Sequence, residues 1–191
     1  MKKILLSIRI YIIFTVLLGL IYPLVVTVIA QVILPYQANG SIMRNGDKVI
    51  GSKLIGQNFS NPEYFHSRPS ANNYDAVNSG GTNLGPSSKK LMDSTAEKIA
   101  KVRQENGLSS DTKIPSDMVL SSASGLDPHI SLQSALLQVN RISKIRGIAV
   151  KDLKKMIDNN TDTDFVGIWG RPGVNVFKLN LAIDDFAKDL K

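Results

Sequence analysis

The chain has 191 residues, no cysteine and a formal net charge of +7, from 23 Lys and Arg against 16 Asp and Glu. The lack of cysteine excludes a disulfide framework and thiolate metal sites. Three basic residues precede a long apolar run, which leaves 20 of the 23 basic side chains beside the 16 acidic ones. Because these charges are mixed along the sequence and fit solvated helix faces, nucleic acid is not an expected partner.

The apolar run extends from Ile10 to Leu34 and contains no charged side chain in 25 residues. A helix of that length reaches about 37 Å, more than the roughly 30 Å hydrocarbon core of a bilayer. The sequence therefore predicts one transmembrane helix over 10–34, in contact with membrane lipid.

The charges around this helix predict its orientation. Lys2, Lys3 and Arg9 precede it, whereas the residues from Pro35 to Ile42 carry no charge. By the positive-inside rule, residues 1–9 form a cytoplasmic tail. The remainder, 35–191, is then expected to be extracytoplasmic in a single-pass chain.

A cleaved signal peptide is the alternative interpretation, because Val28-Ile29-Ala30 has small residues suited to a cleavage site. The apolar run is about twice the usual 7–15 residues of a signal peptide, which favours a retained anchor. Thr15, Gly19 and Tyr22 are spaced as a packing stripe for another membrane helix. The Leu and Ile residues all around the helix fit plain lipid exposure equally well.

The part after the anchor is expected to fold as an α+β domain. Asn45-Gly46 lies between two short runs and is a strong hairpin signal, with Gly51 and Gly56 allowing a bulge or a tight bend. The elements predicted from periodicity and capping residues are strands near 41–44 and 47–55, a helix from Ser87 or Ser88 to about Asn106, a short helix opened by Pro115, a helix from Ser131 to Gly147, a helix from Val150 to about Asp158, a strand over 174–179 and a C-terminal helix over 181–190.

The helix after Ser131 follows a segment, 124–131, that is predicted to form a compact turn. This helix has the clearest apolar stripe of the domain. The stripe consists of Leu132, Ala135, Leu136, Val139 and Ile142. These five side chains are expected in the core.

The stretch from Asn61 to Ser88 is rich in Gly, Pro, Ser and Asn and has no helical or strand period. Loops of this length inside a compact domain are either functional or disordered. The interleaved aromatics Tyr64, Phe65 and Tyr74 favour an ordered loop that is fixed to the domain. Its Ser79-Gly80-Gly81 triplet is compatible with anion binding, but turn formation is the favoured interpretation.

The sequence has no catalytic signature. His66 and His129 are the only histidines, and neither has a partner at metal-ligand spacing. A structural role is favoured for His129, which directly follows Asp127-Pro128. The chain contains no phosphate loop, no nucleophile elbow and no D-K-T-G phosphorylation motif. We therefore expect no catalytic residues, no firm metal site and no enzyme activity from this chain alone.

Six ordered blocks carry a family resemblance. They are GSKLIGQNF (51–59), YFHSRPSANNY (64–74), SGGTNLGP (79–86), SGLDPHIS (124–131), QVNRISKIRG (138–147) and VNVFKLNLAID (174–184). Behind one N-terminal anchor, this order closely resembles the C subunit of the Kdp potassium-transporting ATPase. One departure is visible, because the family's last block reads close to P-R-V-N-V whereas Arg171 is followed here by Pro172-Gly173.

The resemblance implies a non-catalytic accessory subunit of a bacterial or archaeal inner-membrane pump that imports potassium. The implied partners are a channel-like A subunit, a P-type B subunit that hydrolyses ATP and a small F subunit. The resemblance implies no firmly bound cofactor, with ATP entering through the complex. It also implies a catalytic chaperone that raises the ATP affinity of the B subunit, which conflicts with a domain outside the membrane.

The leading hypothesis places the exported domain over the outer mouth of the channel-like subunit. Oxygen atoms near a pore mouth raise the local concentration of potassium. Candidates for this effect are Asp75, Asn78, Asn83, Asp117 and Asp127. Structural roles for these residues are the favoured interpretation.

The alternative hypothesis is nucleotide binding by a catalytic chaperone. Its candidate residues are Arg68, Ser79, Gly80, Gly81 and Lys89, around the phosphates. A third interpretation is an anchored domain of unrelated function.

Overall fold

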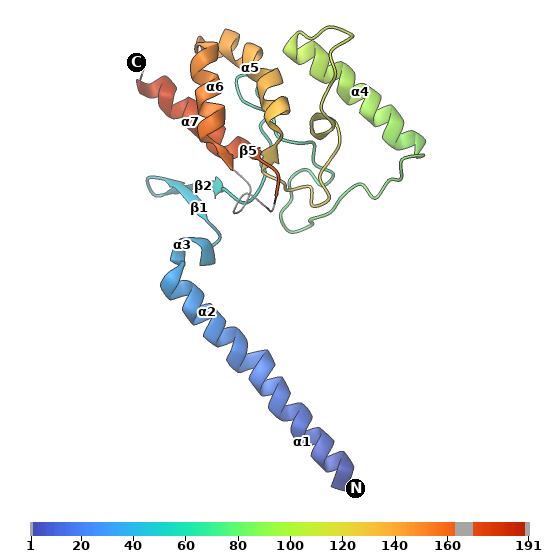
Figure 1. Cartoon of the computed structure of the whole chain (residues 1–191), viewed down its shortest axis with the longest axis vertical. Helices are drawn as coiled ribbons and strands as arrows, with labels where there is room; N and C mark the ends of the chain where they lie inside the picture. The colour runs from blue at the N-terminus through green and yellow to red at the C-terminus, as the bar shows by residue number, and fades with distance from the viewer. Residues whose placement is uncertain (1, 163–169, 190–191) are drawn as a thin grey trace. The chain divides into compact units, whose positions relative to one another are not determined.

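The computed structural model describes residues 2–162 and 170–189. The chain divides into two compact units, Met1–Ser52 and Lys53–Lys191. Figure 1 shows the elements of each unit. The predicted C-terminal helix ended at Leu190, which lies outside the described residues.

The first unit begins with one continuous helix from Lys2 to Ile33, long and apolar enough to cross a membrane. It consists of α1 (Lys2–Val16), a π-helical segment (Leu17–Ile21) and α2 (Tyr22–Ile33). None of its side chains is buried in α1 or α2. The helix starts before the apolar run, so the three basic residues lie in its own first turns.

The π-helical segment has a local cause. Pro23 has no N–H, and its ring collides with the carbonyl four residues earlier in a regular α-helix. Directly before it the Tyr22 N–H donates to the Leu17 carbonyl, which is the wider spacing of a π-turn. The extra residue in this turn makes room for the proline without ending the helix.

The first unit ends with a short helix, α3 (Pro35–Ala38), and a hairpin of β1 (Ile42–Asn45) and β2 (Lys48–Ser52). The predicted hairpin is confirmed, but its turn is one residue later because Asn45 still pairs with Lys48. Gly46, with φ of +60°, supplies the positive angle of this turn. The predicted second strand was too long, since β2 ends at Ser52.

The second unit is an α+β domain, as predicted. Its small antiparallel sheet has the order β3-β5-β4. In this unit α5 packs against α6, α6 against α7, and α4 against α5. The bounds are α4 (Lys89–Asn106), a 3-10 turn η2 (Ser116–Met118), β3 (His129–Ile130), α5 (Leu132–Arg146), α6 (Val150–Asn159), β4 (Thr161–Asp162), β5 (Gly173–Asn175) and α7 (Val176–Asp189).

The predicted helix caps are confirmed. Ser88 accepts a hydrogen bond from the Leu91 N–H at the start of α4, and Gly107 ends it with φ of +62°. Ser131 caps α5 in the same way, and Gly147 ends it. Pro115, however, precedes only the single 3-10 turn η2.

The prediction for the C-terminal segment was wrong. Residues 174–179 are not one strand, because β5 ends at Asn175 and α7 begins at Val176. Val174 in β5 and Val176 in α7 are both fully buried. The apolar residues of this segment therefore fit the two-residue repeat of a strand as well as the 3.6-residue repeat of a helix. The Asn175 side chain then accepts a hydrogen bond from the Lys178 N–H, which stabilises the start of the helix. The predicted turn at 124–131 likewise contains β3.

The core forms where α5, α6 and α7 meet the sheet. Its fully buried side chains include Leu153, Ile157, Leu179 and Ile183, together with Phe65 from the long loop. This packing explains why three helices and a very small sheet suffice to form one domain.

The predicted stripe on α5 is correct only in part. Ala135, Val139 and Ile142 are buried, but Leu132 and Leu136 are each 41% exposed. The flank that is buried in their place carries polar side chains, Ser134, Gln138 and Arg141. The spacing of apolar residues therefore predicted a buried face of α5 that is rotated by about one residue position from the face that is buried in the structure.

The buried polar side chains hold the long loop. Between Ser52 and Lys89, a stretch whose residues are all described, the chain has no helix or strand. Even so, the Phe65 N–H donates to the Asn180 side-chain oxygen at 2.9 Å and the Phe65 carbonyl accepts from the Asn180 amide at 2.9 Å. Next to it, the His66 N–H donates to the Gln138 side-chain oxygen at 2.8 Å. Two helix side chains thus replace the hydrogen bonds that a neighbouring strand would supply.

We predict that Asn180→Leu lowers the free energy of unfolding by about 2–5 kcal/mol, because it leaves two buried backbone groups of Phe65 without partners. The matched control is Asn140→Leu on the exposed side of α5, with an expected change within about 0.5 kcal/mol. Chemical denaturation of the full-length chain in detergent, followed by circular dichroism, measures both. Equal effects of the two substitutions would contradict the bracing role of Asn180.

Candidate functional site

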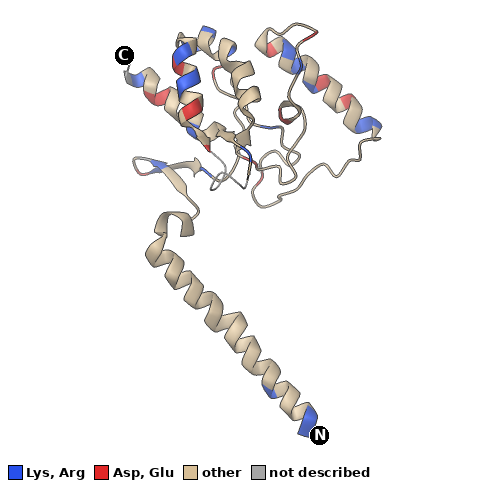
Figure 2. Ribbon diagram, in the orientation of Figure 1, with Lys and Arg blue, Asp and Glu red and all other residues tan. Residues whose placement is uncertain are grey.

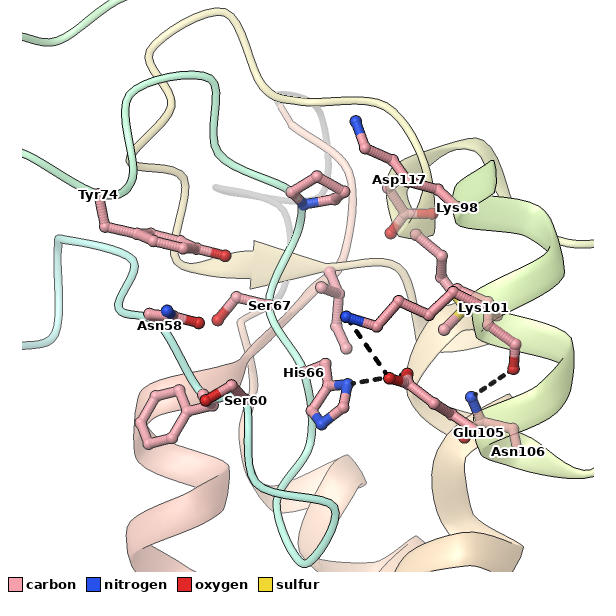
Figure 3. Close-up of a pocket in the computed structure, with 15 residues that line it drawn as sticks. Asn58, Ser60, His66, Ser67, Tyr74, Lys98, Lys101, Glu105, Asn106 and Asp117 are labelled. Carbon is pink, nitrogen blue, oxygen red and sulfur yellow. Dashed lines mark hydrogen bonds and ion pairs between the residues drawn. The ribbon is translucent and has the colours of Figure 1, made fainter. Parts of the chain in front are cut away.

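The second unit contains a pocket of about 240 Å³ between the long loop and α4. Figure 3 shows the side chains that line it, which come from the loop, α4, η2 and β3. The lining residues are Asn58, Phe59, Ser60, His66, Ser67, Pro69, Tyr74, Lys98, Lys101, Val102, Glu105, Asn106, Asp117, Met118 and Ile130.

His66 is the only histidine among the described titratable groups that line this pocket. Its Nε2 lies 3.1 Å from the Asn61 carbonyl and its Nδ1 lies 3.5 Å from Glu105. Burial, together with the positive charge of Arg141, lowers the pKa of His66. At neutral pH the ring is therefore neutral, with Nε2–H donating to Asn61. Lys101, at 3.7 Å, is then the charged partner of Glu105.

Most of the polar groups in the pocket are already used by the fold. The Asp117 carboxylate accepts hydrogen bonds from the Ser131 N–H and from the Ser134 hydroxyl at the start of α5. The Ser67 and Tyr74 hydroxyls donate to backbone carbonyls. The volume also lies below the roughly 300–1,000 Å³ of typical ligand pockets. These observations favour a packing hollow over a small-molecule site.

A second cluster is a chain of alternating charges on the other side of the same loop. Arg68 pairs with Asp127 at 2.9 Å, and His129 Nδ1 lies 3.6 Å from that carboxylate. On its other side, His129 Nε2 lies 2.9 Å from Asp162, which also pairs with Lys178 at 3.0 Å. The cluster connects the loop, β3, β4 and α7.

The two carboxylates control the charge of His129. The hydrogen bond to Asp127, and then the hydrogen bond to Asp162, raise the pKa of His129 despite its partial burial. Burial by itself raises the pKa of Asp127, but hydrogen bonds from His129 and Arg68 bring it below its usual value. The structural role predicted for His129 is consistent with this geometry.

The nucleotide candidates lie in different surroundings. Arg68 is paired with Asp127, and the Ser79 hydroxyl and the Gly80 N–H both donate to the Ser124 carbonyl. Gly81 lies close to the backbone of residue 123, and Lys89 is exposed at the start of α4. The Ser79 hydroxyl and the Gly80 N–H are thus engaged in holding a turn, and phosphate binding by the candidate residues remains a prediction.

The potassium candidates are brought together only in part. The Asp75 carboxylate accepts a hydrogen bond from the Asn78 amide at 2.6 Å, whereas Asp127 belongs to the charge cluster around His129. Asn83 is exposed, with φ of +53°. Asp117 caps α5. Among residues 2–162 and 170–189 there is no group of three or more His, Cys, Asp or Glu placed to hold a metal ion.

The anchor candidates lie around the π-helical segment. Thr15 donates its hydroxyl to the Tyr11 carbonyl at 2.8 Å, Gly19 lies inside the segment, and Tyr22 is 62% exposed. A π-turn changes the angular step of the helix. The α-helical spacing that would place Thr15, Gly19 and Tyr22 on one face is therefore altered by the π-turn. Their role in packing against another helix remains a prediction.

Comparison with known proteins gives the family. Residues 4–185 match the family described as "KdpC: K+-transporting ATPase, c chain". The chain belongs to the KdpC family. A relative from Caldanaerobacter subterraneus subsp. tengcongensis, named "Potassium-transporting ATPase KdpC subunit", is 46% identical over 177 residues, covering 93% of this chain and 92% of the relative. Proteins of the same name are 47% identical in Rhodopseudomonas palustris, over 89% of this chain and 90% of the relative, and 42% identical in Mycobacterium bovis, over 96% and 98%.

Membership of the KdpC family confirms the resemblance seen in the sequence blocks. The chain is therefore a subunit of the Kdp potassium-transporting ATPase, and its described residues include one helix long and apolar enough to cross a membrane. Its relatives are named as subunits of that ATPase.

The departure near the last block has a structural setting. Gly173 begins β5, and a Cβ at this position would lie 3.1 Å from the Cβ of His129. A side chain here would press on the neighbouring strand, so the glycine leaves room for the imidazole. Arg171 is exposed.

Sequence reasoning missed the side chains that brace the loop. Besides Gln138 and Asn180, Arg141 donates to the Pro62 carbonyl and Arg146 to the Glu63 carbonyl at 3.3 Å. Three of the four lie in the block 138–147. The only sequence signal was a set of polar residues beside an apolar helix stripe. Such a pattern does not specify partners that lie 72 to 115 positions away in the sequence.

We predict that the charge cluster makes stability depend on pH. Because the pKa of His129 is raised above its ordinary 6.5, its contribution is fully present below pH 6.5 and is lost as the pH rises through the folded-state pKa. Part of the free energy of unfolding should therefore disappear between mildly acidic and alkaline pH in the wild type, and His129→Gln should lack that loss.

The control for this experiment is His66→Gln. Because the pKa of His66 is lowered, its contribution to the free energy of unfolding is present above pH 6.5 and is lost on acidification, the opposite of His129. The His66→Gln variant should therefore still lose stability as the pH rises. Denaturation of the full-length chain at several pH values measures all three proteins. Identical alkaline slopes for wild type and His129→Gln would show that the cluster does not couple to folding.

Proposed function

We propose that the chain acts as a non-catalytic accessory subunit that assembles and stabilises the potassium pump from the outer side of the membrane. In this proposal the second unit covers the outer mouth of the channel-like A subunit. The anchor packs in the membrane beside the other subunits, which include the catalytic B subunit and the small F subunit.

The position of charge on the anchor carries the proposal. Lys2, Lys3 and Arg9 lie in the first turns of the spanning helix, as Figure 2 shows for the N-terminal end. After the helix the next charged residue is Arg44. Cytoplasmic ends of membrane helices carry the excess of Lys and Arg, so this asymmetry supports a cytoplasmic N-terminus and an exported second unit.

This orientation separates the second unit from ATP. The nucleotide is cytoplasmic, and the bilayer core of roughly 30 Å would lie between it and the exported residues. Two of the candidate phosphate ligands are also engaged within the fold, Arg68 with Asp127 and the Gly80 N–H with the Ser124 carbonyl. Both observations favour the accessory role over a nucleotide-binding catalytic chaperone, which requires the second unit to be in the cytoplasm.

The accessory role is mainly structural in this proposal. The Asp75 carboxylate and the Asn78 backbone carbonyl already accept hydrogen bonds within their own loop. Any effect on the potassium concentration at the pore mouth would then come from the charge of Asp75, whose pKa is lowered by hydrogen bonds from Asn78 and Val77.

We predict that a Ser87→Cys variant, in intact cells that produce the complex, reacts with a membrane-impermeant maleimide without lysis. Ser87 is exposed just before α4, and the chain has no native cysteine to compete. Lysed cells give the total reactivity. The matched control is Ser7→Cys near the N-terminal end of α1, which is expected to react only after lysis.

The reverse labelling pattern would overturn the proposed orientation. Reaction at position 87 only after lysis would place the second unit in the cytoplasm. The catalytic chaperone would then be the better proposal.

A further inference from the structure

The loop from Asn72 to Ser79 ends in a solvent-exposed apolar tip. Val77 is 90% exposed, and no large apolar side chain among the described residues is more exposed. Its neighbours Asp75, Ala76 and Asn78 are exposed as well. Single exposed apolar residues are ordinary on protein surfaces. The backbone conformation and the hydrogen bonds around Val77 are what distinguish it from such residues.

The backbone at the base of the tip is strained. Asn73 and Tyr74 have φ of +55° and +61°, in the left-handed region that asparagine tolerates and that a bulky side chain such as that of Tyr74 rarely adopts. The Tyr74 hydroxyl donates to the Arg68 carbonyl at 2.6 Å, and its N–H donates to the Ser70 hydroxyl at 2.9 Å. Such strain persists only where surrounding contacts fix it, and it is concentrated at functional positions.

The tip is also cross-linked internally. The Asn72 amide donates to the carbonyls of Asp75 and Asn78, at 2.9 and 2.6 Å. The Asp75 carboxylate in turn accepts from the Val77 N–H and from the Asn78 amide, at 2.9 and 2.6 Å. The backbone on both sides of Val77 is therefore held in one conformation by hydrogen bonds that do not involve the Val77 side chain.

A second attachment joins the loop to the turn at 122–125. The Gly80 N–H and the Ser79 hydroxyl both donate to the Ser124 carbonyl, at 2.9 and 3.0 Å. A Cβ at Gly125 would lie 2.4 Å from the Asn72 side-chain oxygen, so this glycine permits the close approach. The loop is thus rigid at its base and at its tip.

From these contacts we propose that the loop 72–79 is a preformed docking element that inserts the Val77 side chain into an apolar pocket on the extracytoplasmic surface of another subunit of the transporter. Rigid presentation reduces the conformational entropy lost on binding, which is the benefit that the strained base would provide. The ionised Asp75 beside Val77 specifies a pocket whose rim carries hydrogen-bond donors or a positive charge.

The choice of partner rests on the proposed function, in which the second unit faces the outer side of the complex. A KdpC-family chain works among other subunits, and a side chain as small as valine fills a pocket for one residue. A second copy of this chain and open solvent are the other occupants that the experiment distinguishes.

The experiment uses Val77→Cys, which introduces the only thiol of the chain. The rate of maleimide modification is measured in the purified complex and in the same chain purified alone. We expect modification in the complex to be at least about tenfold slower, because only the undocked fraction reacts. Met92→Cys, 54% exposed on α4, is the matched control and should react at the same rate in both samples.

A photoreactive benzophenone-maleimide, attached to the thiol that Val77→Cys introduces, then identifies the neighbour. A covalent adduct with another subunit of the complex supports the proposal. An adduct with a second copy of the chain, or equal maleimide rates in the complex and in the chain alone, overturns it. Both measurements use purified protein and do not depend on the Ser87→Cys labelling in cells, so a failure of this inference is distinguishable from a failure of the proposed orientation.

Discussion

The domain depends on satisfying the backbone of a chain segment that has no neighbouring strand. Buried N–H and C=O groups must find partners, and residues 62–66 enter the core region without belonging to a sheet. Asn180 from α7 binds both backbone groups of Phe65, and Gln138 from α5 binds those of His66. With its backbone satisfied in this way, Phe65 can be fully buried and helices on both sides can close around it.

The bracing has consequences along the rest of the loop. The fixed segment leads directly to Arg68, whose carbonyl holds the strained Tyr74 and whose guanidinium pairs with Asp127. The docking element at 72–79 and the charge cluster are therefore both connected to the braced segment through Arg68. A subunit of a membrane complex benefits from such fixed surfaces, because a rigid element binds its partner with less loss of entropy than a mobile loop.

Local patterns in the sequence predicted the local structure, and failed where distant residues decide it. The long apolar helix near the N-terminus, the hairpin and the caps at Ser88 and Ser131 follow from short-range chemistry, and the structure contains all of them. Strand β3 has only two residues and exists because β5 pairs with it, and the apolar residues from 174 onward fit either a strand or a helix. The contacts of Asn180 with Phe65 join residues 115 positions apart. No spacing rule specifies such a pair, although the order and aromatic content of the loop did indicate that it is fixed to the domain.

Hydrogen exchange at the backbone of Phe65 and His66 tests the bracing most directly. Amides of an exposed loop exchange through small local openings, whereas amides held in the core exchange only when the whole domain unfolds. We predict that these two amides, in the full-length chain in detergent, exchange as slowly as the amides of Val139 and Ile142 in α5. Exchange at the fast rate of the exposed amides near Ser109 and Ser110 would show that the helix side chains do not hold the loop, and would contradict the bracing of the loop by Asn180 and Gln138.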